Sequence, residues 1–293
     1  MISFKNVIKK YDEKLVLDTI NWDLKSGHCY GLVGPNGSGK STILRLISGV
    51  IESESGTVTV DDQSIFDNPQ IKNRIFFLAD DPYFFPQSTM DDMKNFYKRF
   101  YPKFDDNLYE SLIEEFKLDP KVKINSFSKG MKRQVMIILA FACKPDILLL
   151  DEAFDGLDPR MRFKLRQFIS QEISESDILV IISSHNLREL EDICDHIALI
   201  NNKKLQMDAT TYEVQDLYHK YQMVFKEPFD IEHIKALNPT YVSGTDRIFT
   251  VVFKGDNNEA HQGLKALNPL ILEEGDVSLE EVFMYETEES EHA

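Results

Sequence analysis

The sequence predicts an α/β protein in which helices cover a parallel sheet, followed by a small α+β domain. Three apolar segments, residues 29–33, 147–150 and 178–182, are typical of buried parallel strands. A glycine-rich turn joins the first of them to an apolar helical segment, and after Met207 the pattern changes to short strands and helices. A chain of 293 residues exceeds the usual single domain. We therefore expect a large domain at residues 1–210 and an accessory or regulatory domain at residues 211–293.

The composition limits the classes of function. The net charge of −16 argues against a surface that wraps a nucleic acid, so no nucleic-acid partner is expected. The three cysteines, Cys29, Cys143 and Cys194, are scattered in apolar segments, which favours buried, reduced thiols in a cytosolic protein. Residues 1–7 alternate like a strand and lack the features of a secretory signal. The longest apolar run, Val135–Cys143, is less than half of the roughly 20 residues that span a bilayer, so we expect no membrane-spanning segment.

Residues 34–41, Gly-Pro-Asn-Gly-Ser-Gly-Lys-Ser, match the phosphate-binding pattern G-x-x-x-x-G-K-[ST]. The loop lies between the strand 29–33 and the helical segment 42–47, so backbone N–H groups at a helix N-terminus would face an anion. Lys40 would reach the terminal phosphates, and the Ser41 hydroxyl would ligate Mg²⁺. We expect a nucleoside triphosphate to bind here. The residues expected to hold it are Gly34, Pro35, Asn36, Gly37, Ser38, Gly39, Lys40, Ser41 and Thr42.

Polar groups follow two further apolar strands. Asp151 and Glu152 end the strand 147–150, where α/β sheets place their ligands. Asp151 would hold Mg²⁺ and Glu152 would orient or deprotonate the attacking water, although a purely structural acidic pair is the alternative. His185 follows the strand 178–182 and could donate a hydrogen bond to a γ-phosphate oxygen. The other six histidines show no metal-ligand spacing along the chain.

Residues 125–134, Asn-Ser-Phe-Ser-Lys-Gly-Met-Lys-Arg-Gln, lead into an apolar helix. Here the chain resembles the ATP-binding-cassette (ABC) ATPases, whose hallmark is an L-S-G-G-Q signature before a helix. The phosphate loop, this signature, the Leu150–Glu152 segment, the run Asp155–Pro159 and His185 agree with that family in order and spacing. The resemblance covers roughly residues 1–210. It implies a P-loop NTPase cassette with a helical subdomain at about residues 85–145.

The resemblance also implies a mechanism. ABC cassettes dimerise head to tail, so each ATP lies between the phosphate loop of one subunit and the signature of the other. Ser128 and Gly130 would therefore complete the γ-phosphate site in trans, and Asp158 would act at the dimer interface. Tyr11 matches the aromatic residue that stacks on adenine. ATP and Mg²⁺ are the implied substrate and cofactor.

Three features depart from the family pattern or add to it. Asp80 stands where the family usually has a glutamine that touches Mg²⁺, so we expect it to be a metal ligand, directly or through water. Lys129 and Met131 replace a glycine and the glutamine of the signature, and Lys129 either approaches the partner's ATP or faces solvent. The aromatic residues 83–85 lie where the family docks a membrane subunit, with core packing as the alternative.

The C-terminal region predicts β-α-β-β-α-β, the ferredoxin-like order. The strands are expected at 221–226, 241–243, 248–253 and 270–272, the helices at 231–237 and 258–267, and a turn at 244–246. The run Lys-Ala-Leu-Asn-Pro occurs at residues 235–239 and again at 265–269, where each proline blocks continuation of the helix. Residues 278–284 resemble the closing helix of cassettes from ABC-2-type exporters, and residues 286–293 read as a frayed acidic end.

Together these features predict an ATP-hydrolysing subunit of an ABC-2-like exporter of peptide, antibiotic or similar cargo. Its partners would be a second cassette and separate transmembrane permease subunits, at the cytoplasmic face of the cell membrane. Two alternatives remain. One is a soluble ABC-type ATPase acting on ribosomes or nucleic acid, and the other is a regulatory cassette in a heterodimer.

Overall fold

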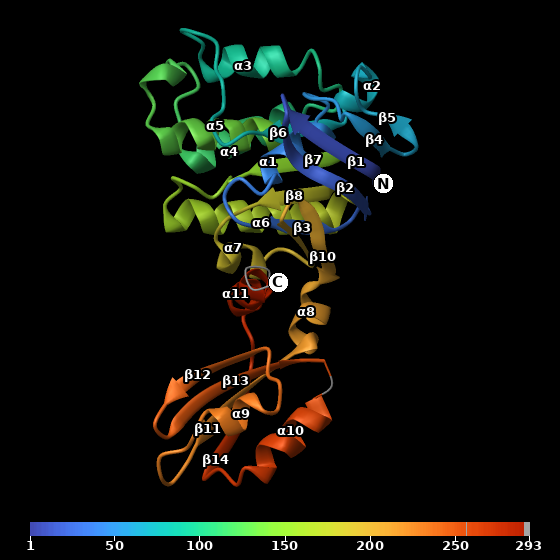
Figure 1. Ribbon diagram of the computed structural model, residues 1–293. Helices are drawn as coiled ribbons and strands as arrows, with labels where there is room; N and C mark the ends of the chain where they lie inside the picture. The colour runs from blue at the N-terminus through green and yellow to red at the C-terminus, as the bar shows by residue number, and fades with distance from the viewer. Residues whose placement is uncertain (256, 290–293) are drawn as a thin grey trace. The chain divides into compact units, whose positions relative to one another are not determined.

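The computed structural model describes residues 1–255 and 257–289 (Figure 1). The chain divides into two compact units, residues 1–208 and 209–293. The division lies two residues before the domain boundary expected from the sequence.

The first unit is built on a six-stranded sheet in the order β10-β9-β3-β8-β7-β6. The pairs β3–β9, β3–β8, β8–β7 and β7–β6 are parallel, and every residue of β3, β7 and β8 is buried. Burial on both faces explains why these strands are continuously apolar. The strands are β3 (Cys29–Val33), β6 (Ile75–Leu78), β7 (Ile147–Asp151), β8 (Leu179–Ser183), β9 (His196–Asn201) and β10 (Lys204–Thr210).

A second, antiparallel sheet has the order β2-β1-β4-β5. Helix α1 (Lys40–Ile47) contacts β4 of this sheet and β7 of the central sheet, so it packs between the two. The core there joins Phe4, Ile43, Leu149 and Ile181, each at most 1% exposed. This packing fixes the helix N-terminus that follows the glycine loop. The strands are β1 (Ile2–Tyr11), β2 (Lys14–Leu24), β4 (Ser55–Val60) and β5 (Gln63–Ser64).

Helices α3 (Met90–Tyr97), α4 (Asp106–Phe116) and α5 (Lys129–Ala142) lie together at one side of this unit (Figure 1). Thr89 begins α3 with a capping box to Asp92. The apolar run 135–143 is buried in α5 and its C-cap, which explains its hydrophobicity. Residues 98–105 separate α3 from α4. The unit also contains α2 (Pro69–Lys72), the 3₁₀ helix η1 (Ile124–Ser126), α6 (Pro159–Ser176) and α7 (Leu187–Glu191).

The second unit has the predicted ferredoxin-like order, which is confirmed. Its sheet runs β12-β13-β11-β14 with all neighbouring strands antiparallel, and two helices connect the strands. Asn238 and Asn268, in the repeated run, both adopt a φ of 54°, so each copy ends its helix in the same left-handed conformation. The elements are α8 (Thr211–Leu217), β11 (Tyr218–Val224), α9 (Glu232–Lys235), β12 (Tyr241–Thr245), β13 (Ile248–Lys254), α10 (Asn257–Ala266) and β14 (Ile271–Gly275).

Two local expectations in this unit are wrong. Strand β12 continues to Thr245, so the turn lies at Asp246 and Arg247, and Asp246 supplies the positive φ of 62°. Helix α11 (Leu279–Glu289) extends past the expected closing helix, so residues 286–289 are helical, while residues 290–293 lie outside the described part of the chain. Glu286 anchors this extension because its carboxylate accepts from the Tyr218 hydroxyl and the Lys254 ammonium.

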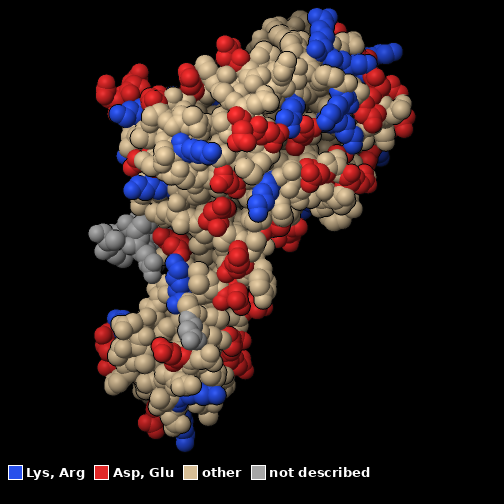
Figure 2. Space-filling view, turned by 90° about the vertical axis from the view of Figure 1, so that its right-hand side faces the viewer, with Lys and Arg blue, Asp and Glu red and all other residues tan. Residues whose placement is uncertain are grey.

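All three cysteines are buried and free, as expected. On the face drawn in Figure 2, basic side chains are interspersed with acidic ones. No helix in the described residues combines the length and the hydrophobicity that a bilayer crossing requires.

Candidate active site

Two glycines of the loop between β3 and α1, Gly34 and Gly39, occupy positions where a side chain would collide with neighbouring atoms. Gly34 has a φ of 153°, and a Cβ there would lie 2.2 Å from the carbonyl oxygen of Ile200. Gly39 has a φ of 113°, and its Cβ would lie 2.6 Å from the Leu17 side chain. The loop is therefore packed tightly against its neighbours. Thr42 lies buried in the first turn of α1 beyond the loop.

Within the described residues, the Lys40 ammonium forms no ion pair and the Ser38 hydroxyl forms no hydrogen bond. The Lys40 ammonium is buried, and within the described residues it donates only to the carbonyls of Gly34, at 2.8 Å, and Pro35, at 3.3 Å. Desolvation lowers the pKa of Lys40, and the nearby carboxylates of Glu152 and Asp151 oppose that shift. The Ser38 hydroxyl is buried and has no hydrogen-bond partner in the part of the chain that the structure describes. A phosphate in the loop would satisfy both groups, so the site fits a phosphorylated ligand.

Asp151, at the carboxyl end of β7, faces the loop. Its Oδ1 accepts hydrogen bonds from the Ser41 hydroxyl at 3.1 Å and from the Ser183 hydroxyl at 2.6 Å. Asp151 is only 3% exposed, so these bonds fix its carboxylate. The structure thus brings together Ser41 and Asp151, both predicted metal-binding residues. Hydroxyl and carboxylate oxygens are the ligands that Mg²⁺ prefers.

Glu152 and His185 form a second pair at the same edge of the sheet. The Oε2 atom of Glu152 lies 2.9 Å from Nδ1 of His185 and accepts from the His185 backbone N–H at 3.3 Å. The hydrogen bond to Glu152 raises the pKa of His185, and desolvation opposes that shift. Glu152 also has a φ of 50°, an uncommon backbone conformation for this residue type that is held by a bond from its N–H to the Ser183 carbonyl.

Arg133 is a site residue that no local sequence pattern indicates. It projects from α5, is 1% exposed, and donates to three oxygens: the Glu152 carbonyl, the Asp80 carbonyl and, at 2.9 Å, Oδ1 of Asp80. The contact of Asp80 with a metal stays a prediction, whereas its carboxylate already has a partner in Arg133. Arg133 therefore links the signature helix α5 to the two segments that carry Asp80 and Glu152.

The signature and the segment after Glu152 lie against each other. Ser128 begins α5 and accepts from the Met131 N–H at 3.2 Å. A Cβ on Gly130 would lie 2.7 Å from the Gly156 carbonyl oxygen, so only glycine fits this contact without displacing the backbone. Asp158 begins α6 and accepts from the Met161 N–H at 3.0 Å. Ser128, Lys129 and Asp158 are all exposed.

The expected adenine-stacking residue, Tyr11, ends β1 and is 39% exposed. The Lys9 ammonium lies 5.3 Å from the centre of its ring. Within the described residues, neither a hydrogen bond nor a ring contact joins Tyr11 to the phosphate loop.

The three aromatic residues after Asp80 differ in burial. Phe84 is 8% exposed and belongs to the core, whereas Tyr83 and Phe85 are 72% and 43% exposed. Phe85 packs edge-on against Phe96, which in turn contacts the exposed Phe100. We call Tyr83, Phe85, Phe96 and Phe100 the aromatic surface.

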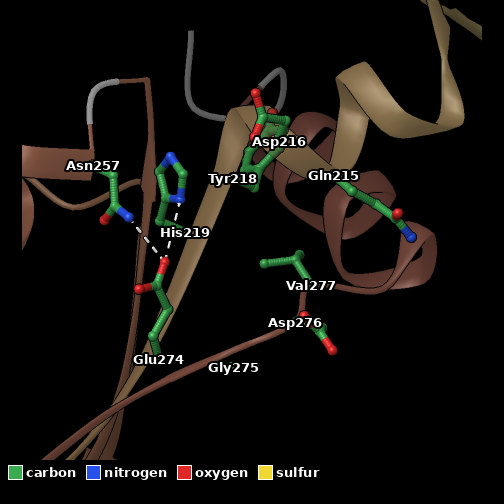
Figure 3. A pocket seen from close by; sticks show the side chains of 9 residues that line it. All are labelled: Gln215, Asp216, Tyr218, His219, Asn257, Glu274, Gly275, Asp276 and Val277. Atoms are coloured by element: carbon green, nitrogen blue, oxygen red, sulfur yellow. Dashed lines mark hydrogen bonds and ion pairs between the residues drawn. The ribbon is translucent and has the colours of Figure 1, made fainter.

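A cavity of about 570 Å³ lies in the second unit, and none of its lining residues belongs to the first (Figure 3). Glu274 accepts there from the Asn257 amide at 2.9 Å and pairs with His219 at 3.6 Å, while Asp216 and Asp276 contribute further carboxylates. The cavity carries none of the nucleotide-binding groups described above.

Comparisons with known proteins agree with this geometry. The family model described as "ABC transporter" matches residues 17–155. The chain is 31% identical to the ABC transporter ATP-binding protein YtrB of Bacillus subtilis over 97% of both chains. It is also 31% identical to the linearmycin resistance ATP-binding protein LnrL of Bacillus subtilis, over 70% of this chain and 68% of that protein. A solved structure described as the ATP-binding subunit of an ABC transporter matches with a TM-score of 0.68 and 25% identity, covering 73% of this chain and 91% of that one.

The predictions of an ABC cassette, of ATP binding and of ATP hydrolysis are therefore confirmed. The chain belongs to the ATP-binding proteins of ABC transporters, and it is an ATPase of the ABC type.

Proposed function

We propose that this chain is the motor subunit of an exporter whose transmembrane segments lie on separate chains. The observation that carries the proposal is the arrangement of Glu152, held by His185 at 2.9 Å, beside a phosphate loop whose Ser41 contacts Asp151. A carboxylate base next to a triphosphate site is what hydrolysis requires. The names of the relatives, ABC transporter and linearmycin resistance ATP-binding proteins, support transport out of the cell, with antibiotic-like or peptide cargo.

Each residue has a defined task in the proposed reaction. The loop amides, Ser38 and Lys40 hold the phosphates of ATP. A water oxygen attacks the γ-phosphorus in line with the bond to ADP, Glu152 orients this water and accepts a proton from it, and ADP leaves. His185 positions the Glu152 carboxylate and donates to a γ-phosphate oxygen. Ser41 and Asp151 would hold Mg²⁺, which when bound neutralises charge on the phosphates.

The working form in this proposal is a head-to-tail dimer. The exposed hydroxyl of Ser128 and the first N–H groups of α5 are available to a second molecule. They would contact the γ-phosphate bound by the partner's loop, because a helix N-terminus favours an anion. Asp158, also exposed, would lie at this interface, and Tyr11 would stack on adenine.

Arg133 would connect the two ATP sites of such a dimer. It belongs to the signature helix, which contacts the partner's ATP, yet it donates to the backbone of Glu152 in its own site. A shift of α5 when the partner's ATP binds would therefore reach Glu152 through a single side chain. Arg133 is a positioning residue in this account, because it touches neither ATP nor water.

The aromatic surface is the proposed attachment point for the transmembrane subunits. Tyr83 and Phe85 are exposed and stand three and five positions after Asp80, which pairs with Arg133, so a bound partner would lie one short segment from that pair. Such attachment would place the chain at the cytoplasmic face of the membrane. Exposed aromatic side chains are typical anchors of protein interfaces.

Purification of tagged protein from detergent-solubilised native membranes tests this proposal. We expect a polytopic membrane protein to co-purify with the wild type, and the double variant Tyr83→Ser with Phe85→Ser to lose it while keeping ATPase activity. The variant Phe163→Ser, which removes an aromatic ring that is 60% exposed on α6, is the matched control and should keep the partner. Recovery only from the soluble fraction with ribosomes or nucleic acid would instead support the alternative class of ABC ATPase.

A further inference from the structure

Two histidines and an aspartate gather at the amino ends of β3 and β9, whereas the ATP site lies at the carboxyl end of β3. These two parallel strands pair with Tyr30 opposite His196. His28 precedes β3, Asp195 precedes β9, and His196 begins it. The phosphate loop follows the carboxyl end of β3, so the two sites lie at opposite edges of the sheet. No local pattern indicates this group, because His28 and His196 stand far apart in the chain.

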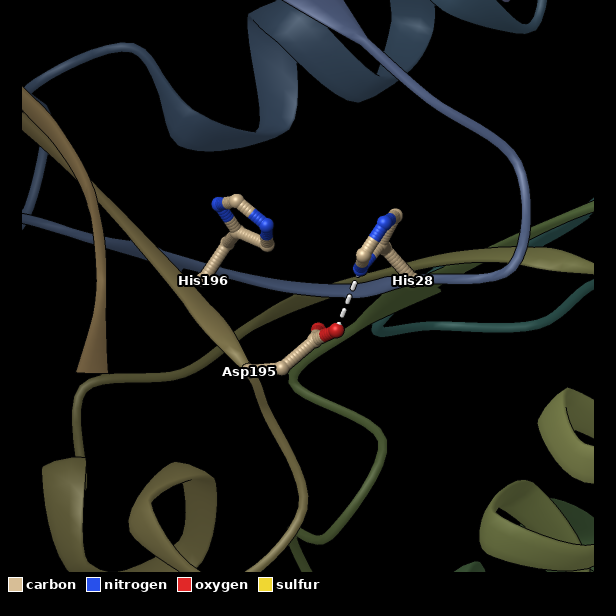
Figure 4. Close-up of side chains that lie close together, drawn as sticks. All are labelled: His28, Asp195 and His196. Atoms are coloured by element: carbon tan, nitrogen blue, oxygen red, sulfur yellow. Dashed lines mark hydrogen bonds and ion pairs between the residues drawn. The ribbon is translucent and has the colours of Figure 1, made fainter. Parts of the chain in front are cut away.

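We propose that His28, Asp195 and His196 form a binding site for a zinc ion. Each residue offers one ligand atom, a ring nitrogen or a carboxylate oxygen, and these three atoms lie within 4.8 Å of one another. Figure 4 shows the two imidazole rings side by side, with the Asp195 carboxylate directed toward His28. Two imidazoles and a carboxylate, with one position left for water, are a common ligand set for Zn²⁺. Mg²⁺ and Ca²⁺ prefer oxygen ligands alone and fit this set poorly.

The backbone and neighbouring rings already orient these ligands. Oδ1 of Asp195 accepts from the Cys29 backbone N–H at 2.7 Å, which leaves Oδ2 directed toward His28 Nδ1 at 2.5 Å. The His196 ring stacks on Tyr30 with centroids 4.7 Å apart, and it meets the His28 ring edge-on at 4.9 Å. Such contacts outside the ligand set fix ligand orientation in metal sites.

The His196 ring nitrogens and the Asp195 carboxylate are accessible to a cation. Among the described residues, no hydrogen bond engages either ring nitrogen of His196, and no lysine or arginine pairs with Asp195. His28 and Asp195 have side chains that are 37% and 48% exposed, so an ion and its water can enter. Tetrahedral Zn²⁺ places its ligand atoms about 3.3 Å apart. Zinc binding would therefore require the His28 Nδ1–Asp195 Oδ2 pair, now 2.5 Å apart, to open, and any wider ligand separations, all within 4.8 Å, to close.

Titration of the full chain with Co²⁺, which reports four-coordinate geometry by visible absorption, tests the site. We expect one tetrahedral Co²⁺ per chain, displaced by Zn²⁺. The variants His28→Gln and His196→Gln should each weaken binding by at least about tenfold. Both should keep the wild-type far-ultraviolet circular dichroism and the wild-type ATPase rate without added Zn²⁺. His185→Gln is the control, because Glu152, Asp155 and His185 are the other such group of ligand-type residues within the described chain.

Four results would overturn the proposal. The first is the absence of a tetrahedral spectrum at stoichiometric Co²⁺, and the second is a spectrum that survives both His28→Gln and His196→Gln. The third is an intense near-ultraviolet thiolate band, which would assign the metal to Cys29 and Cys194, whose sulfur atoms lie 3.4 Å apart beside the proposed site. The fourth is a spectrum lost only in His185→Gln, which would place the ion at the ATP site instead.

Discussion

Replacing Arg133 with methionine removes the guanidinium that joins α5 to Glu152 and Asp80 while keeping a side chain of similar length. The Glu152 and Asp80 carbonyls would each lose a charged donor, and a hydrogen bond to a charged group contributes about 1.5–3 kcal/mol. The ion pair adds little, because Asp80 is 54% exposed and exposed pairs contribute about 0–1 kcal/mol. Part of this loss is offset because the buried Arg133 cation, whose Nε has no hydrogen-bond partner among the described residues, is removed. We therefore expect a loss of about 2–4 kcal/mol in the free energy of unfolding.

Chemical denaturation and steady-state ATPase measurements check this prediction. Turnover should fall further than stability alone explains, because the Glu152 backbone loses its anchor while ATP binding by the loop remains. Asp80→Asn is the matched control, because it keeps the backbone carbonyl of residue 80 and removes only the exposed charge. It should lower the free energy of unfolding by less than about 1 kcal/mol. If Arg133→Met matched the wild type in both stability and turnover, the proposed link through Arg133 would be wrong.

Three further predictions concern the site and the buried thiols. Ser128→Arg should abolish ATP turnover while Lys129→Gly leaves it near wild type, and equal loss in steady-state assays would contradict the assigned roles. Glu152→Gln should lower the pKa of His185 in nucleotide-free protein, measured by NMR, because the hydrogen bond to Glu152 raises it. With the folded pKa raised, this pair stabilises the fold below the ordinary histidine pKa of about 6.5 and loses that contribution as the pH rises through the folded value. Burial raises the pKa of Cys29, so native protein should resist thiol alkylation at pH 8, and rapid labelling would show that the site is open.

Local sequence patterns predicted the features that depend on local chemistry. The phosphate loop was predicted from its glycine pattern. The structure explains the pattern, because a Cβ on Gly34 would collide with Ile200 and a Cβ on Gly39 would collide with Leu17. The repeat at 235–239 and 265–269 predicted two similar helix ends. Asn238 and Asn268 do adopt the same left-handed conformation there. Continuous apolar strands predicted the buried parallel sheet.

Features that depend on tertiary pairing could not be predicted. Arg133 lies in a polar stretch of the signature, and nothing near it in the sequence indicates that it meets Asp80, 53 positions away. The aromatic run 83–85 did not reveal which ring is buried, because alternation in a loop depends on its path over the core. His28 and Asp195 are separated by 167 positions and meet only because β3 and β9 are neighbours in the sheet.

The most direct test of the account is the variant Glu152→Gln, assayed for ATP binding, turnover and molar mass with and without ATP. If Glu152 activates the water and the signature binds ATP in trans, the variant should bind ATP, lose nearly all turnover, and form a dimer by light scattering only when ATP is present. Lys40→Ala should fail to form that dimer, because the loop loses its phosphate-binding cation. Normal turnover in Glu152→Gln would remove this residue from the mechanism, and a protein that binds ATP but stays monomeric would contradict the head-to-tail arrangement.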